Sequence, residues 1–239
     1  FAMKGIDYVV HSAALKQVEA AEYNPIECVK TNVFGAENVI KAAINNKVRK
    51  VIALSTDKAT NPVNLYGATK LASDKLFISA NNIVGRNKTR FSIVRYGNVI
   101  GSRGSVLPLF QNLTRSGNNI LPITDVKMTR FWISLKDGVD FAIKCLRIMI
   151  GGEILIKKSP SIKIVDLAKA INPKAKIKII GVRPGEKINE ILTSVDDSEN
   201  VISFDNHYLV KPSINLLVKS SYMRNILNEV GKKVSKSFE

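Results

Sequence analysis

The chain has 239 residues, with 36 Lys and Arg against 20 Asp and Glu, and its formal net charge is +16. Hydrophobic residues make up 45% and charged residues 23%, which is typical of a folded globular protein and excludes a disordered tail. No apolar run approaches the roughly 18 residues of a membrane span. Two cysteines are too few for a disulfide framework. We therefore expect a cytoplasmic protein without a membrane partner, with room for one large domain or somewhat more.

The positive charge suggests nucleic-acid binding, because dense Lys and Arg neutralise a phosphate backbone. However, the lysines are scattered along the chain, and no helix-turn-helix, zinc-finger or RNA-recognition motif is present. We therefore expect no nucleic-acid partner and assign a few of these charges to a small anionic substrate.

Apolar runs alternate with segments of helical periodicity in the first half of the chain, which predicts a parallel α/β sheet. The predicted elements are, in order, a strand at 7–12, a helix at 26–46, a strand at 50–54, a helix at 65–80 and a strand at 90–95. Each strand ends in small or polar residues. Because doubly wound sheets bind ligands at the carboxyl ends of their strands, the site is expected where these ends meet.

The elements become shorter and more mixed after residue 105. Strands are predicted at 120–123, 131–134, 153–157 and 176–181, and helices at 135–149 and 164–171. We interpret this part as a smaller α/β region that covers the ligand edge of the sheet. The tail from about residue 203 is polar and basic, and its pattern predicts no particular element.

The sharpest local motif is Tyr66-Gly67-Ala68-Thr69-Lys70, a YxxxK sequence at the start of a predicted helix. Residues four apart share a helix face, and a neighbouring ammonium lowers the pKa of a phenol, so Tyr66 could serve as a general base. YxxxK alone is weak evidence, because any amphipathic helix can carry Tyr and Lys at this spacing. The preceding strand and its polar sequence, residues 55–58, strengthen the functional interpretation.

Five segments together resemble a known family: HSAALKQVEAAEYNP, TDKATNPVNLYGATKLASDK, RYGNVIGSRGSVLPLF, MTRFWIS and GVRPGEK. They are similar to the extended short-chain dehydrogenases/reductases that act on UDP-N-acetylglucosamine. More narrowly, they resemble the configuration-inverting 4,6-dehydratases of pseudaminic acid synthesis, which are grouped with CapD-like polysaccharide biosynthesis proteins. The resemblance implies a Rossmann-like doubly wound parallel sheet with a smaller α/β substrate-binding region. It divides the chain into a partial NADP-binding domain with the catalytic residues (1–105), a mainly UDP-sugar-binding region (106–202) and a tail (203–239).

The resemblance also implies a mechanism and its residues. Tyr66, assisted by Lys70 and Thr56, would take the proton of the sugar 4-hydroxyl while hydride leaves C4 for NADP⁺. The resulting ketone acidifies the C5 proton, for which Lys58 is the base, a role that requires a neutral and partly desolvated amine. Protonated Asp57 would donate to the departing 6-hydroxyl. By themselves, Asp57 and Lys58 would be interpreted as a solvated turn.

The remaining site residues are also implied by the resemblance. Besides Tyr66 and Lys70, those expected to contact NADP are Ser12, Ala13, Ala14, Lys16, Leu54 and Ser55. Those expected to hold the UDP-sugar are Lys16, Asn98, Arg103, Gly104, Ser105, Arg183 and Glu186. No metal is expected, and members of the family tend to form homo-oligomers.

The opening β-α unit of the family, with its Gly-rich phosphate loop, has no counterpart in this sequence, which begins at Phe1. That unit provides the helix N-terminus on which the pyrophosphate lies. We therefore expect an N-terminally truncated sheet with an apolar edge strand at 7–12, weak NADP binding and poor folding of the chain alone.

Two alternatives stay open. A UDP-sugar C4-epimerase also uses YxxxK and hydride transfer but needs no elimination pair such as Asp57 and Lys58. An inactive remnant that acts as a basic binding protein is the alternative from another class.

Overall fold

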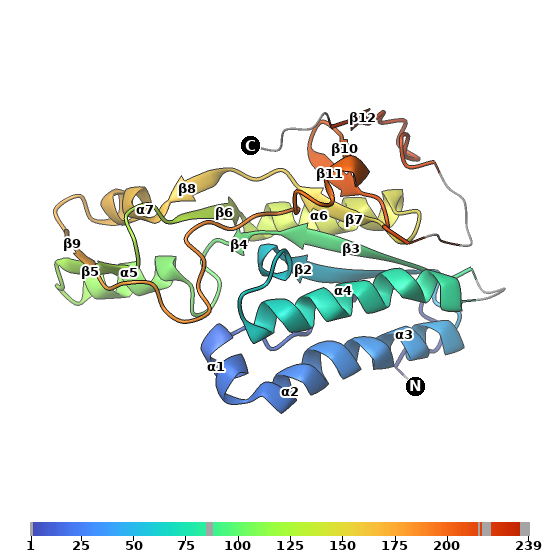
Figure 1. Cartoon of the computed structure of the whole chain (residues 1–239), viewed down its shortest axis with the longest axis horizontal. Helices are drawn as coiled ribbons and strands as arrows, with labels where there is room; N and C mark the ends of the chain where they lie inside the picture. Colours follow the sequence, from blue (N-terminus) through green and yellow to red (C-terminus); the bar gives the residue numbers. More distant parts are fainter. Residues whose placement is uncertain (1, 85–87, 215, 217–220, 235–239) are drawn as a thin grey trace.

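The computed structural model describes residues 2–84, 88–214, 216 and 221–234, and its main feature is a seven-stranded sheet (Figure 1). Four neighbouring strands are parallel: β1 (Tyr8–His11), β2 (Lys50–Thr56), β3 (Arg90–Tyr96) and β7 (Ile154–Lys157). Three antiparallel strands follow in space: β11 (His207–Val210), β10 (Val201–Ser203) and β12 (Lys232–Lys233). The parallel core confirms the predicted α/β class.

Helices cover both faces of the parallel strands, as a doubly wound fold requires. Side chains alternate along β2: Val51 and Ala53 pack in a cluster with α3 (Gly35–Asn45) and α4 (Leu65–Ile83), whereas Ile52 packs with α6 (Leu135–Ile148). Figure 1 shows α3 and α4 side by side along one face of the sheet. The predicted Rossmann-like architecture is thereby confirmed.

The helical stretch before β2 has a π-helical turn in its middle. It consists of α2 (Pro25–Val29), the π-helix η1 (Lys30–Phe34) and α3, and the short α1 (Val18–Tyr23) precedes it. Asn32 of the π-helix is buried and exchanges hydrogen bonds with the backbone of Leu15, while its Nδ2 also donates to the Thr69 hydroxyl. This side chain therefore holds the loop after β1 against helix α4.

Strand β1 forms the outer edge of the sheet, as the sequence predicted. Its Val9 side chain packs against the α3 and α4 cluster, but on the opposite face Tyr8 is 51% exposed and Val10 is 46% exposed. This face of β1 is apolar and open because α6 covers β2 and β3 but not β1.

A second region extends from the carboxyl ends of the main strands (Figure 1). It contains a three-stranded sheet of β4 (Asn98–Val99), β6 (Thr129–Ile133) and β8 (Ser161–Lys163), and a pair formed by β5 (Ile120–Ile123) and β9 (Lys176–Ile179). Helices α5 (Val106–Arg115) and α7 (Ile164–Ile171) pack on it around Phe110, Leu121 and Trp132. The smaller α/β region is therefore present, with α5 as an element that the sequence analysis did not predict.

The assignment of all elements after residue 105 to this smaller region was wrong for two of them. Strand β7 pairs in parallel with β3, and α6 packs its Phe141 and Cys145 on the main sheet. The elements become shorter after residue 105 because the chain leaves the main sheet there to form the smaller region. The chain returns to the main sheet at Ser134, the residue that caps α6 by accepting from the Asp137 amide.

The tail likewise returns to the main sheet. The 3₁₀ turn η3 (Ser198–Asn200) leads into β10, and β11 pairs with β7 through four residues. Leu209, Val210 and Ile202 are buried there. The sequence predicted no element for this stretch because strands this short carry little periodicity of their own and depend on their neighbours.

Candidate active site

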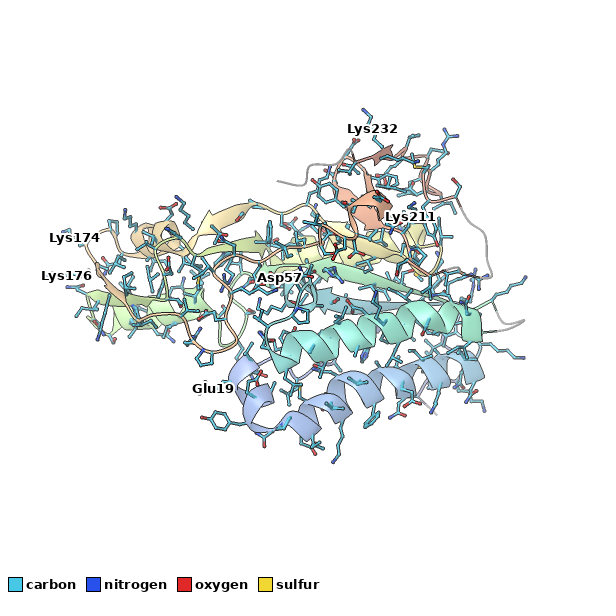
Figure 2. All side chains as sticks on the ribbon, in the orientation of Figure 1. Glu19, Asp57, Lys174, Lys176, Lys211 and Lys232 are labelled. Atoms are coloured by element: carbon cyan, nitrogen blue, oxygen red, sulfur yellow. The ribbon has the colours of Figure 1, made fainter. Side chains whose placement is uncertain are left out.

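The catalytic motif lies where β2 ends and α4 begins. Thr56 closes the strand, and the 3₁₀ turn η2 (Asp57–Ala59) follows, with the Thr56 hydroxyl accepting from the Lys58 amide at 3.3 Å. Asn64 caps α4 by accepting from the Gly67 amide at 2.8 Å, so Tyr66 falls in the first helical turn. Figure 2 shows Asp57 near the centre of the molecule, between the start of α4 and the main sheet.

Gly67 allows helix α4 to approach the turn that carries Asp57 and Lys58. A Cβ atom at this position would lie 2.2 Å from the Lys58 carbonyl oxygen and 3.0 Å from Pro62 Cβ. Only a residue without a side chain fits this contact. The glycine of YxxxK therefore brings the tyrosine and the Asp-Lys turn into one site.

Hydrogen bonds join three predicted catalytic residues, and a fourth, Tyr66, lies beside them. Thr56 Oγ1 donates to Asp57 Oδ1 at 2.9 Å, and Thr56 is near enough to the Tyr66 phenol to lower its pKa. Lys58 Nζ donates to the same Asp57 oxygen at 3.1 Å. Asp57 is fully buried, and its other oxygen, Oδ2, has no hydrogen-bond partner among the residues that the structure describes. Such an unpartnered carboxylate oxygen is what a ligand hydroxyl would satisfy.

The ionisation of Tyr66 differs from the sequence-based expectation. Burial raises the pKa of the phenol, and the carboxylates of Asp57 and Asp74 raise it further, although the hydrogen bond to Thr56 opposes them. Lys70 directs its ammonium at the Leu54 carbonyl oxygen, 2.9 Å away, and burial lowers the pKa of Lys70. The predicted lowering of the Tyr66 pKa is therefore wrong, because desolvation dominates.

The surroundings of Lys58 include a residue that the sequence analysis missed. Its Nζ lies 3.4 Å from Glu190 Oε1 in addition to its contact with Asp57, and its side chain is 22% exposed. Two carboxylates from separate segments therefore hold the end of this side chain in the site. The sequence signal was slight: Glu190 follows the PGEK motif by three residues and stands 132 positions after Lys58.

The residues predicted to contact the cofactor lie in two different settings. Ser12, Ala13 and Lys16 are exposed in the loop after β1, and Lys16 Nζ donates to the Arg103 carbonyl oxygen at 3.3 Å. Ala14 is half-buried in the same loop. Ser55, by contrast, is buried and donates to Asp74 Oδ2 at 2.7 Å, and the same oxygen accepts from Arg95. The Ser55 hydroxyl is therefore engaged within the fold.

The predicted substrate residues gather on the side of the smaller region. Asn98 Oδ1 and Ser105 Oγ are buried atoms without a hydrogen-bond partner in the described part of the chain, while Arg103 and Gly104 are exposed. Both atoms could accept hydrogen bonds from a bound sugar or nucleotide.

The segment around Arg183 reaches the catalytic motif through its backbone. Asn64 Nδ2 donates to the Gly185 carbonyl oxygen at 2.7 Å, which ties this segment to the start of α4. Arg183 and Glu186 form a two-point ion pair, with both distances at 3.1 Å. Burial alone would raise the pKa of Glu186, but the hydrogen bond from Arg183 and the charges of Arg183 and Arg130 lower it overall.

Comparison with known proteins places this geometry in a family. The sequence profile of the polysaccharide biosynthesis proteins matches residues 1–212. The chain belongs to this family. It is 58% identical over 238 residues to a Campylobacter jejuni protein named UDP-N-acetylglucosamine 4,6-dehydratase (inverting), covering 99% of this chain and 71% of the relative.

Two further relatives extend the comparison. A Rickettsia bellii protein named UDP-glucose 4-epimerase is 47% identical over 213 residues, which cover 87% of this chain and 62% of that protein. The crystal structure of Pen from Bacillus thuringiensis superposes with a TM-score of 0.88 at 40% identity, over 99% of this chain and 71% of that one. Both enzyme types weighed from the sequence thus occur among its relatives.

The polysaccharide biosynthesis family and the YxxxK motif imply a nicotinamide dinucleotide, and the residues present fit one end of it. A buried phenol and a buried ammonium lie one helical turn apart at the carboxyl edge of the sheet, where hydroxyl groups of a ribose need donors and acceptors. Among the described residues there is no cluster of three potential metal ligands, and none of the helices in that part is long and apolar enough to cross a membrane.

Proposed function

We propose that this chain catalyses the 4,6-dehydration of UDP-N-acetylglucosamine with inversion at C5, giving a UDP-6-deoxy-4-keto sugar. The observation that carries the proposal is the hydrogen-bonded group of Thr56, Asp57 and Lys58, with the Tyr66 phenol beside Thr56. This arrangement places Tyr66, the base for oxidation at C4, beside the acid Asp57 and the amine Lys58. Removal of water requires such an acid and base. The 58% identity to the Campylobacter dehydratase supports the same substrate.

Each of these catalytic residues has a distinct part in the reaction. Tyr66 takes the proton of the 4-hydroxyl, with Thr56 and Lys70 orienting it, and the bound nicotinamide supplies the hydride acceptor and donor. Lys58 removes the C5 proton, which the neighbouring ketone has made acidic. Asp57, as the protonated acid, donates to the 6-hydroxyl as the C6–O bond breaks, so that water leaves.

The same residues offer a route by which a proton can pass from Tyr66 back to Asp57. Tyr66 gains one proton from the 4-hydroxyl, and Asp57 loses one to the departing water. Thr56 donates to Asp57 Oδ1 at 2.9 Å and lies beside the Tyr66 phenol. A hydroxyl accepts and donates at once, so it can pass this proton from Tyr66 to Asp57 and restore the acid.

Four finer assignments belong to this proposal. NADP is the cofactor that the family resemblance favours. The smaller region after residue 105, without α6 and β7, is expected to bind mainly the UDP-sugar. A homo-oligomer is the expected assembly. A reducing cytoplasm suits the two cysteines, Cys28 and Cys145, which are both buried free thiols.

A second candidate is a UDP-sugar 4-epimerase, which the Rickettsia relative favours. The two are separated by incubating the chain, joined to the Gly-rich β-α unit of its family, with UDP-N-acetylglucosamine and NADP⁺ in D₂O and examining the product by NMR. The dehydratase gives a 6-deoxy-4-keto sugar that carries deuterium at C5. A 4-epimer that keeps its oxygen at C6 would overturn the dehydratase proposal in favour of the second candidate.

A further inference from the structure

We propose that Glu190 is a positioning residue for Lys58, holding its ammonium against Asp57 through the elimination step. The inference rests on the proposed dehydration, because only that reaction assigns work to Lys58. Neither the YxxxK motif nor the Asp-Lys turn contains Glu190, which reaches the site from a segment far along the chain.

Two carboxylates contact Lys58 Nζ. Asp57 Oδ1 lies at 3.1 Å and Glu190 Oε1 at 3.4 Å, so the ammonium is held by carboxylates from two separate segments. The Glu190 side chain is 3% exposed, and a carboxylate this well buried is stable only beside positive charge. Since Lys58 carries four rotatable side-chain bonds, one partner from its own turn would leave its end free to move.

The residues on both sides of Glu190 are tied to the catalytic edge, one through its side chain and one through its backbone. Lys187 Nζ donates to the Thr60 carbonyl oxygen at 2.6 Å and lies 3.6 Å from Glu190 Oε2. The Leu192 carbonyl oxygen accepts from Arg95 at 3.1 Å. Anchors three residues before and two residues after Glu190 therefore fix where its carboxylate points.

The charge of Glu190 has a definite role in the proton balance. In the proposed reaction, Asp57 is protonated and the Lys58 amine is neutral before elimination. When the C5–H bond breaks, its proton moves to Lys58 Nζ, and the Asp57 proton leaves with the 6-hydroxyl as water. Glu190 then faces a newly formed ammonium and stabilises it, which favours the products of this step. Because the configuration at C5 inverts, C5 afterwards receives a solvent proton on the opposite face, and Lys58 releases its own proton to solvent.

The first test removes the charge of Glu190 and keeps its size, with the variant Glu190→Gln. We expect kcat for dehydration to fall about tenfold, while KM for the UDP-sugar stays nearly unchanged. Formation of reduced nicotinamide in a single turnover should be unaffected, because Tyr66 and Lys70 do not contact Glu190. Glu190→Asp, which keeps the charge, should retain more activity than Glu190→Gln.

A second readout does not depend on catalysis. Acetic anhydride acylates only neutral amines, so the acetylation rate of Lys58, measured by mass spectrometry against the exposed lysines, reports its neutral share. We expect Glu190→Gln to raise this rate several-fold, since a charge at 3.4 Å has been removed. The matched control is Glu27→Gln, which breaks the exposed Lys30–Glu27 pair at 2.9 Å and should leave both Lys58 acetylation and dehydration unchanged.

The outcomes separate this inference from the proposed function. If the wild type yields no dehydrated sugar, the proposed function is wrong, whatever the acetylation shows. If the wild type dehydrates its substrate but Glu190→Gln changes neither Lys58 acetylation nor kcat, the role of Glu190 is refuted. If Glu190→Gln slows nicotinamide reduction and dehydration equally, with Lys58 acetylation unchanged, Glu190 supports the fold and does not position Lys58.

Discussion

Replacing Gly67 by alanine tests whether helix α4 must touch the Asp-Lys turn. The new Cβ would lie 2.2 Å from the Lys58 carbonyl oxygen and 3.1 Å from its carbonyl carbon. Alanine in place of glycine inside a helix normally stabilises by about 1 kcal/mol. Overpacking against a backbone that cannot turn away costs about 1–3 kcal/mol or more, so the clash outweighs the gain.

We therefore expect Gly67→Ala to lower the free energy of unfolding by about 2 kcal/mol. Relief of the clash must move the Lys58 backbone by about 1 Å, a displacement that costs on the order of 10²-fold in kcat. The assays are urea denaturation followed by circular dichroism and the rate of formation of the keto sugar.

The matched control is Gly138→Ala, in helix α6. A Cβ there meets only Ile133 Cδ1, at 3.9 Å, which is an ordinary contact. This variant should be as stable as the wild type or up to about 1 kcal/mol more stable, with normal activity. A Gly67→Ala protein that matched Gly138→Ala in both stability and activity would refute the argument from close approach.

Three further predictions concern other parts of the molecule. Asn64→Ala removes the cap of α4 and the hydrogen bond to the Gly185 carbonyl, so denaturation should show a loss of about 1–2 kcal/mol; an unchanged midpoint would contradict this. Burial lowers the pKa of His207 to about 4, below its usual 6.5. The unfolded chain therefore binds more protons, so this residue's contribution to stability is complete above pH 6.5 and is lost as the pH falls towards 4, by about 3 kcal/mol. His207→Leu should flatten this part of the stability curve, and a curve parallel to the wild type would show that His207 is not responsible. Lys58→Ala should abolish dehydration but spare nicotinamide reduction, and unchanged turnover would remove Lys58 from the mechanism.

The sequence predicted the parallel strands and the site at their carboxyl ends because both depend on local signals. Residues 51–54 are a continuous apolar run that is followed by polar residues, and YxxxK requires only helical spacing. Strands β10 and β11 were not predicted, since their burial depends on pairing with β7 and with each other.

The energetics of the site could not be predicted from spacing alone. Tyr66 and Lys70 share the expected helix face, yet burial raises the pKa of the tyrosine, and only the packed structure shows how deeply it lies. Glu190 was missed for a related reason. Its contact with Lys58 joins positions 132 residues apart, and no local pattern marks such a pair.

The central claim is that the chain of residues from Tyr66 to Lys58 removes water from a UDP-sugar after oxidising its C4. The most direct measurement uses UDP-N-acetylglucosamine with deuterium at C4, followed by mass spectrometry and NMR of the product. The proposed reaction predicts a sugar lighter by one water, with the deuterium found at C6. A product of unchanged mass with the deuterium still at C4 would contradict it.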